Sequence, residues 1–154
     1  MKRQVLFSMA LVSALTASAQ RIDFNLAGRS ESQVNEPEYT AWAVNTCETE
    51  SKEVEDADGN PITITLANDA SYAGRRLKSC WFKNGLSSSK LIADGFAIYG
   101  YDENKNTPQV TEGAVRLNIT LKGLSAGKHS LMAYHNNNDG FNAPKLDVYV
   151  NGTK

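Results

Sequence analysis

The chain of 154 residues has few cysteines, few histidines and almost no excess charge. Its two histidines, His129 and His135, and its two cysteines, Cys47 and Cys80, do not stand at the spacings of a zinc site. Its 16 basic and 17 acidic residues give a formal net charge of −1. Because nucleic-acid binding calls for a basic patch, we expect no nucleic-acid partner.

Long apolar runs are also scarce, and the one such run lies at the N-terminus. Lys2 and Arg3 precede the apolar segment from Val5 to Leu15, and small residues follow at positions 17 to 19. The run is shorter than the roughly 20 residues that span a bilayer. This three-part pattern predicts a signal peptide, residues 1–19, cleaved between Ala19 and Gln20. We therefore expect a secreted, periplasmic or cell-surface protein without membrane insertion.

Residues 20–154 have the length of one domain and can bury a proper core. Cleavage would remove Lys2 and Arg3 and leave 14 basic against 17 acidic residues. In an oxidising compartment Cys47 and Cys80 could form one disulfide. Two separate buried thiols are the equally weighted alternative.

The segment from Ala114 to Lys122 has the clearest strand pattern. Apolar residues alternate with polar ones at a period of two, which is typical of a strand with one buried face. A short turn with a glycine at each end, residues 123–127, comes next. Residues Lys128 to His135 then suit a returning strand. The pattern therefore predicts an antiparallel hairpin.

Further strands are predicted by the same alternation, and no segment keeps a 3.6-residue period for three turns. Residues 76–82 are ambiguous between a strand and a short helical turn. Residues 56–61 form a strong turn signal before one of the strands. Several short strands separated by turns indicate an all-β antiparallel sandwich or barrel. The further strands are Arg21–Leu26, Ile62–Leu66, Phe96–Tyr101 and Leu146–Val150.

Asn151-Gly152 is a preferred pair for a tight hairpin turn after the last predicted strand. Such a turn sends the chain back beside the strand that it leaves, but the sequence stops at Lys154. We therefore expect the domain to be incomplete at its C-terminal end, as the front piece of a longer polypeptide. Residues 20–154 expressed alone are then expected to fold poorly or to aggregate.

No catalytic or metal-binding constellation stands out in the sequence. Gly123-Leu124-Ser125-Ala126-Gly127 matches the nucleophile elbow of hydrolases, but an elbow needs a helix after it. Residues 102, 104 and 106 alternate like the first ligands of a calcium loop, without its glycine and glutamate in register. We expect a non-enzyme without a cofactor, with a structural calcium ion as a minor alternative.

The residues most suited to binding lie in the polar and aromatic segment from Tyr134 to Asn142. A flat ring can cover the C–H face of a sugar, and amides and carboxylates can bond its hydroxyls. Asn, Asp and Gly are also common turn formers, so an ordinary loop is the alternative. Trp42 and Trp81 each stand beside polar residues, where core packing is the commoner outcome; of the two, Trp42 is favoured to line a site.

Several short motifs together resemble a known family. The chain resembles the N-terminal malectin-like or galactose-binding-like β-sandwich module of secreted polysaccharide lyases and related glycan-degrading enzymes of Bacteroidetes. The motifs cover most of the chain after residue 19 and are individually short. They are Ile22-Asp23-Phe24-Asn25, Glu36-Pro37, Tyr39-Thr40-Ala41-Trp42, residues 117–124, residues 127–136 and Asp147-Val148-Tyr149-Val150-Asn151-Gly152.

The resemblance implies a jelly-roll sandwich that binds a polysaccharide or oligosaccharide and carries no catalytic residue of its own. It implies a catalytic domain downstream in the same chain. One alternative is an N-terminal fragment of a polysaccharide lyase or glycoside hydrolase, and another is a structural spacer or adhesin domain without a sugar site. By resemblance the sugar-binding positions are Tyr39, Trp42, Tyr134, His135, Asn136 and Asp139.

Overall fold

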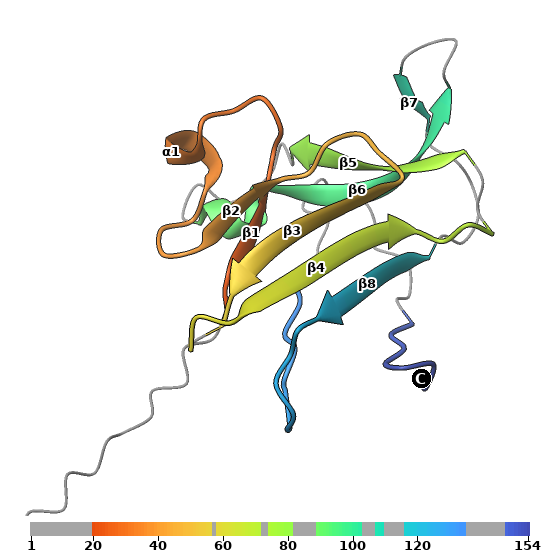
Figure 1. Cartoon of the computed structure of the whole chain (residues 1–154). Helices are drawn as coiled ribbons and strands as arrows, with labels where there is room; N and C mark the ends of the chain where they lie inside the picture. The colour runs from red at the N-terminus through yellow and green to blue at the C-terminus, as the bar shows by residue number, and fades with distance from the viewer. Residues whose placement is uncertain are drawn as a thin grey trace, which may run out of the picture.

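A computed structural model describes residues 20–56, 58–71, 74–81, 89–102, 107–109, 116–134 and 147–154 (Figure 1). Eight strands and two short helices are found in these ranges. The strands are β1 (Ile22–Asn25), β2 (Thr40–Ala43), β3 (Thr49–Glu55), β4 (Pro61–Asn68), β5 (Arg75–Trp81), β6 (Asp94–Asp102), β7 (Thr107–Gln109) and β8 (Leu117–Lys122). The helices are α1 (Glu31–Val34) and the 3₁₀ turn η1 (Lys90–Ile92).

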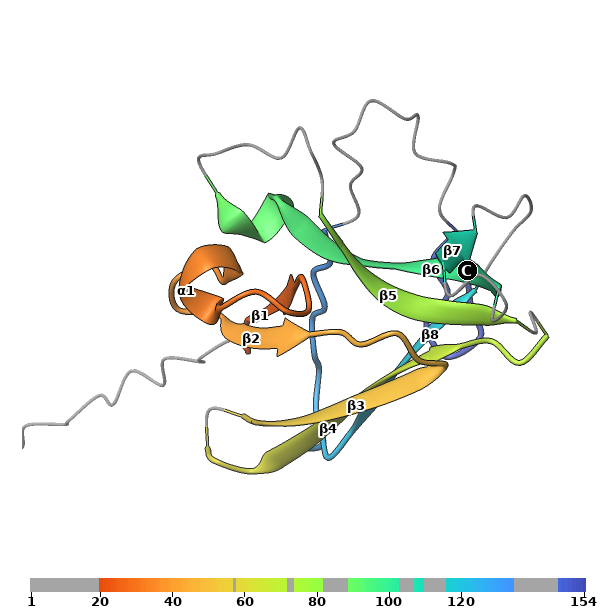
Figure 2. The same ribbon diagram turned by 90° about the horizontal axis from the view of Figure 1, so that it is seen from above.

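The strands form two three-stranded antiparallel sheets and one two-stranded pair. One sheet has the order β3-β4-β8 and the other the order β5-β6-β7. The two sheets lie in separate layers, with β1 and β2 beside one end of them (Figures 1 and 2). The all-β, sandwich-like prediction is therefore confirmed, although the described strands do not close into a single barrel or jelly roll.

The β1–β2 pair departs from the antiparallel prediction, because these strands run parallel with Phe24 opposite Trp42. A parallel pair requires a crossover of about a dozen residues or more. Residues 26–39, which contain α1, provide this connection. The helix itself was not predicted, since a single turn is too short to show a helical period.

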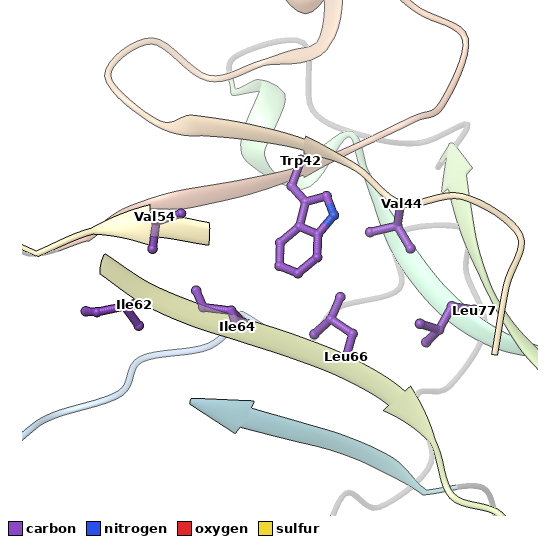
Figure 3. Close-up of a cluster of buried hydrophobic side chains, with 7 residues drawn as sticks. All are labelled: Trp42, Val44, Val54, Ile62, Ile64, Leu66 and Leu77. Atoms are coloured by element: carbon purple, nitrogen blue, oxygen red, sulfur yellow. The ribbon is translucent and has the colours of Figure 1, made fainter. Parts of the chain in front are cut away.

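The core lies between the two sheets, and strand alternation explains its composition. Every second residue of β4 points inward, so that Ile62, Ile64 and Leu66 are buried. Trp42 and Val44 reach this face from β2 and the residue after it, and Leu77 reaches it from β5 (Figure 3). The predicted strand Ile62–Leu66 is thus confirmed as the central strand of its sheet.

The predicted turn at residues 56–61 is confirmed as the connection between β3 and β4. The Asp56 carboxylate accepts hydrogen bonds from the backbone N–H groups of Asp58 (2.9 Å) and Asn60 (2.8 Å). The Asn60 side chain is the largest cause of the lowered pKa of Asp56, and these backbone hydrogen bonds lower it further. An aspartate that bonds the backbone two residues onward is a usual turn former, so the turn explains this acidic residue.

The predicted strand at residues 114–122 is confirmed for Leu117–Lys122, but its partner is different from the one expected. β8 pairs with β4, and residues 128–134 form no strand. The predicted hairpin is therefore wrong. A period-two segment becomes a strand only where a neighbour takes its hydrogen bonds and covers its apolar face, and Leu131 and Met132 are 72% and 80% exposed.

At the C-terminus the predicted tight turn is present. Asn151 and Gly152 both have positive φ, 49° and 81°, as a type I′ turn requires. Val150 and Thr153 exchange two backbone hydrogen bonds of 2.8 and 3.0 Å. The predicted strand before the turn is not formed at residues 147–149, and Leu146 lies outside the described residues.

Residues 76–81 of the ambiguous segment 76–82 belong to strand β5, which ends at Trp81, and Phe82 lies outside the described residues. No disulfide joins Cys47 and Cys80, so the disulfide alternative is not the one observed. Cys47 pairs with Leu77, and Cys80 lies three residues farther along β5. Three residues of a strand span about 10 Å. The Cα atoms of Cys47 and Cys80 therefore lie farther apart than the roughly 7 Å that a disulfide can bridge.

Candidate functional site

Two polar side chains on β1 are almost completely buried. Asp23 is 1% exposed and Asn25 is 2% exposed, and both point away from the face that carries Phe24. Phe24 packs on Trp42, with ring centroids 5.5 Å apart, and on Phe96, at 4.7 Å. Both faces of β1 are therefore covered. Phe24 packs on aromatic rings on one face, and Asp23 and Asn25 are buried on the other.

The Asp23 carboxylate is partly satisfied by the loop between β1 and β2. Its Oδ2 accepts a hydrogen bond of 2.7 Å from the backbone N–H of Glu36. Burial raises the pKa of Asp23, while this backbone donor and the nearby Asn25 amide lower it. No hydrogen bond of acceptable geometry joins the Asn25 amide to any group, so its effect on Asp23 reflects proximity alone.

A second buried carboxylate, Asp94, is located at the start of β6. Asp94 is 4% exposed, and its Oδ2 accepts a 2.7 Å hydrogen bond from the backbone N–H of Leu26. Next to it, the Ser79 hydroxyl accepts a 2.9 Å bond from the backbone N–H of Ala27. These two contacts fix the end of β1 against β5 and β6.

The pKa of Asp94 is raised to about 6. Burial is the largest cause, because it disfavours the charged form. The backbone donor of Leu26 opposes the rise, and the negative charge of Asp23 adds to it. The two carboxylates are thus close enough to interact.

Polar atoms without partners remain in this region. Neither the Nδ2 nor the Oδ1 atom of Asn25 has a hydrogen-bond partner, and the Oδ1 atom of Asp94 has none. A buried polar atom without a partner costs about 1–3 kcal/mol. We call Asp23, Asn25 and Asp94 the polar cluster.

Trp81 lies beside the polar cluster and is the exposed tryptophan of the chain. It is directly opposite Asp94 in the β5–β6 register, so both side chains leave the sheet on the same face. Its side chain is 50% exposed. An indole ring in this position offers an apolar surface to a ligand at the end of the sheet.

Four hydrogen bonds join the β1–β2 loop to the segment at η1, and we call these bonds the strap. Glu36 Oε2 accepts bonds from Ser89 Oγ at 3.0 Å, Lys90 N at 2.8 Å and Leu91 N at 3.2 Å. Lys90 Nζ donates to the carbonyl oxygen of Ser32 at 2.7 Å. The hydroxyl of Ser89, followed by the backbone donors, lowers the pKa of Glu36.

Replacing Glu36 by glutamine is expected to lower the melting temperature at pH 7, because the charged acceptor of the strap is lost. A lowered pKa means that this stabilisation is complete above the ordinary value of 4.5 and is lost as the pH falls through the folded-state pKa. As the pH is lowered from 7 to below 4, Glu36→Gln should therefore lose less stability than the wild type, which thermal melts at the two pH values would show.

Glu38→Gln is the matched control, since Glu38 makes one exposed ion pair of 3.4 Å with Arg21. That variant should melt like the wild type at both pH values. If Glu36→Gln and Glu38→Gln behave alike, the strap does not stabilise the fold.

The binding residues predicted from the sequence have different environments in the structure. Tyr39 is half-buried, and the Arg21 guanidinium lies 5.9 Å from its ring centroid, so a cation already covers one ring face. Tyr134 is 69% exposed. His135, Asn136 and Asp139 lie outside the described residues.

Trp42 is a core residue, which corrects the expectation that it lines a surface site. It is 4% exposed, and its indole Nε1 donates to Glu50 Oε1 at 3.4 Å. A ring at this depth has no free face on which a sugar could stack. Of the two tryptophans, Trp81 is the one at the surface, in contrast to the sequence-based preference.

The polar cluster was not identified from the sequence. The only available signal was the alternation Asp23-Phe24-Asn25 within a predicted strand, and alternation alone does not show that the face with Asp23 and Asn25 is also buried. Among the described residues there is no group of three or more His, Cys, Asp or Glu side chains placed to hold a metal ion. Asn104 and Asn106 lie outside the described ranges. No helix in the described parts of the chain is long and apolar enough to cross a membrane.

Comparison with known proteins gave no match to a family model, to a curated protein sequence or to a solved structure.

Proposed function

We propose that the chain is a secreted, non-catalytic carbohydrate-binding module of a polysaccharide-degrading protein, and that Trp81 is its principal binding ring. The proposal includes a jelly-roll fold of the galactose-binding type and a catalytic domain elsewhere in the same polypeptide. The observation that carries it is the half-exposed indole of Trp81 at the end of β5.

The surroundings of Trp81 suit a sugar. A half-exposed indole can lie against the C–H face of a pyranose ring, which is an apolar contact that leaves the hydroxyls free. The turn at residues 27–30 is held against β5 by the bond from Ala27 N to Ser79 Oγ. Arg29 and Ser30 on this turn are exposed and supply donors and an acceptor for hydroxyl groups.

Tyr134 remains a second predicted binding ring, since its side chain is 69% exposed. Tyr39 is a weaker choice because Arg21 occupies one side of its ring. The proposal therefore ranks Trp81 above Tyr134 and places Tyr39 last.

Affinity gel electrophoresis with embedded polysaccharides, pectins and glycosaminoglycans included, tests the proposal. The wild-type chain should be retarded by one class of polymer. Trp81→Ala should lose most of this retardation, with a drop in affinity of at least about tenfold, because stacking of a nucleic-acid base on an aromatic ring contributes about 1–3 kcal/mol and a sugar face makes an apolar contact of the same kind. Its melting temperature should fall by no more than about 5 °C, since the ring is half-exposed.

Tyr39→Ala is the matched control and should retain nearly full retardation. Retardation that survives in Trp81→Ala would move the site away from β5. A folded wild-type chain that no polymer retards would favour the alternative of a structural spacer without a sugar site.

A further inference from the structure

Strand β8 is an outer strand of its sheet in the part of the chain that the structure describes (Figure 1). It pairs with β4 on one side, and no other strand of the described ranges lies along its second side, which we call the β8 edge. Charged residues on an outer strand hinder pairing with another chain. The opposite outer strand, β3, contains Glu50, Lys52, Glu53 and Glu55, whereas β8 contains only Lys122. The β8 edge therefore lacks the protection that β3 has.

The hydrogen-bond pattern shows which backbone groups lie at the β8 edge. The backbone N–H of Asp69 donates to the carbonyl oxygen of Arg116 at 3.1 Å, so these two residues form a hydrogen-bonded pair. Such pairs alternate with non-hydrogen-bonded pairs along an antiparallel ladder. In the β4–β8 register, every second residue from Arg116 therefore bonds β4. The N–H and C=O groups of Leu117, Ile119 and Leu121 consequently point outward, toward the β8 edge.

The side chains beside the β8 edge are apolar and uncovered. Ile119 and Leu121 lie opposite buried residues of β4, on the sheet face that carries the core. They nevertheless remain 45% and 36% exposed. The apolar inner face of the sheet thus continues past β4 to a strand with unpaired backbone groups. A further strand added at this edge would bond those groups and cover both side chains.

A second copy of β8 fits this edge in an antiparallel register centred on Thr120. Directly opposed residues of an antiparallel pair lie on the same face of the sheet. With Thr120 opposite its own counterpart, Ile119 of each copy faces Leu121 of the other, and Asn118 faces Lys122. The outward backbone groups of Ile119 and Leu121 then form hydrogen-bonded pairs. Side-chain faces and backbone bonding therefore agree in this register.

Neighbouring registers fit less well. A slip of one residue would bring the apolar residues to opposite faces. A slip of two residues in one direction would place Arg116 opposite Lys122, and like charges directly opposite each other are destabilising. A slip of two residues in the other direction would place Ile119 opposite Gly123, which has no side chain to cover it.

We propose that β8 pairs with β8 of a second copy of the chain, antiparallel and with a twofold axis at Thr120. The pairing joins the two three-stranded sheets into one continuous sheet. Both copies use the same surface, as a twofold dimer requires. The inference does not depend on the proposed function, since Trp81 belongs to the other sheet.

Sedimentation velocity of the chain without sugar tests the proposal. Small interfaces bind weakly, so the protein concentration should be varied from roughly 1 to 500 µM. The average mass is expected to rise with concentration from that of one chain toward that of two. A single mass of one chain throughout, or masses that grow beyond two chains, would overturn the proposal.

Thr120→Lys is the informative variant, because Thr120 is exposed and would meet its counterpart across the axis. The variant should fold, and its dimer affinity should fall at least about tenfold because like charges are opposed. Thr120→Glu should behave in the same way, and an equimolar mixture of the two variants should recover the dimer. Ser51→Lys is the matched control, since Ser51 lies in the same row of the sheet, on β3. It should dimerise like the wild type.

Amide hydrogen exchange distinguishes a second copy from residues 128–134 of the same chain as the occupant of the β8 edge. In dilute protein the amides of Ile119 and Leu121 should exchange fast, and dimer formation should protect them. The amide of Thr120 should be protected at every concentration, since it bonds β4. Protection of Ile119 and Leu121 at every concentration, or a Thr120→Lys variant that dimerises like the wild type, would contradict the pairing of two copies.

Discussion

Replacing Trp42 by alanine is expected to lower the free energy of unfolding by about 3–5 kcal/mol, the usual cost of removing a large aromatic side chain from a core. The ring is 4% exposed and packs between the sheets with Val44, Ile64 and Leu66 around it (Figure 3). The substitution would leave a cavity at the centre of this cluster and would leave Glu50 without one of its donors. Urea denaturation followed by circular dichroism would measure the change.

Trp81→Ala is the matched control for this experiment, because it removes the same side chain from a position that is 50% exposed. Its effect on the free energy of unfolding should stay within about 1 kcal/mol. Equal destabilisation by the two variants would contradict the assignment of Trp42 to the core and of Trp81 to the surface. If Trp42→Ala does not fold, Trp42→Phe should fold with an intermediate loss.

Gly123→Ala is expected to be nearly as damaging, with a loss of about 2–4 kcal/mol. Gly123 follows β8 with φ of +90°, a conformation that residues with a Cβ rarely adopt. An added Cβ would also collide with the carbonyl oxygen of Pro61 and approach the Ile62 Cα atom. The close approach of this turn to the start of β4 therefore requires glycine.

Gly59→Ala separates the two causes, since Gly59 has φ of +81° but no heavy atom within 4 Å of the added Cβ. It should cost only about 1–2 kcal/mol, the strain of the backbone alone. Chemical denaturation of both variants gives the difference. A loss in Gly123→Ala no larger than that in Gly59→Ala would show that the turn after β8 moves away from Pro61.

The sequence predicted well those strands whose apolar faces meet the core. Ile62, Ile64 and Leu66 alternate with threonines, and they lie on the buried face of β4. The turn before them and the tight turn at Asn151-Gly152 were also predictable, because both depend on local residue chemistry.

Features that depend on distant partners could not be predicted. Residues 128–134 alternate as a strand would, but β8 takes its hydrogen bonds from β4 instead. Ile119 and Leu121 lie on the same sheet face as Leu66 and Ile64, yet they remain 45% and 36% exposed. Alternation identifies the apolar face of a strand, whereas the segment that covers that face is decided by tertiary structure.

The candidate site was harder to predict for the same reason. The sequence contains two tryptophans beside polar residues, and local context favoured Trp42. Only the fold shows that Trp42 faces β4 and that Trp81 is the exposed last residue of β5. The polar cluster likewise brings Asp23 and Asp94 together across 71 positions of sequence, a proximity that no motif spacing indicates.

The central claim, that Trp81 is the ligand-binding ring and Trp42 a core residue, can be tested by one NMR titration. The chain has two tryptophans and therefore two indole Nε1–H resonances, which Trp81→Phe would assign. Titration with oligosaccharides of the retarding polymer is predicted to shift the Trp81 resonance in proportion to occupancy and to leave the Trp42 resonance in place. A shift of the Trp42 resonance alone, or no shift of either at saturating oligosaccharide, would contradict the account.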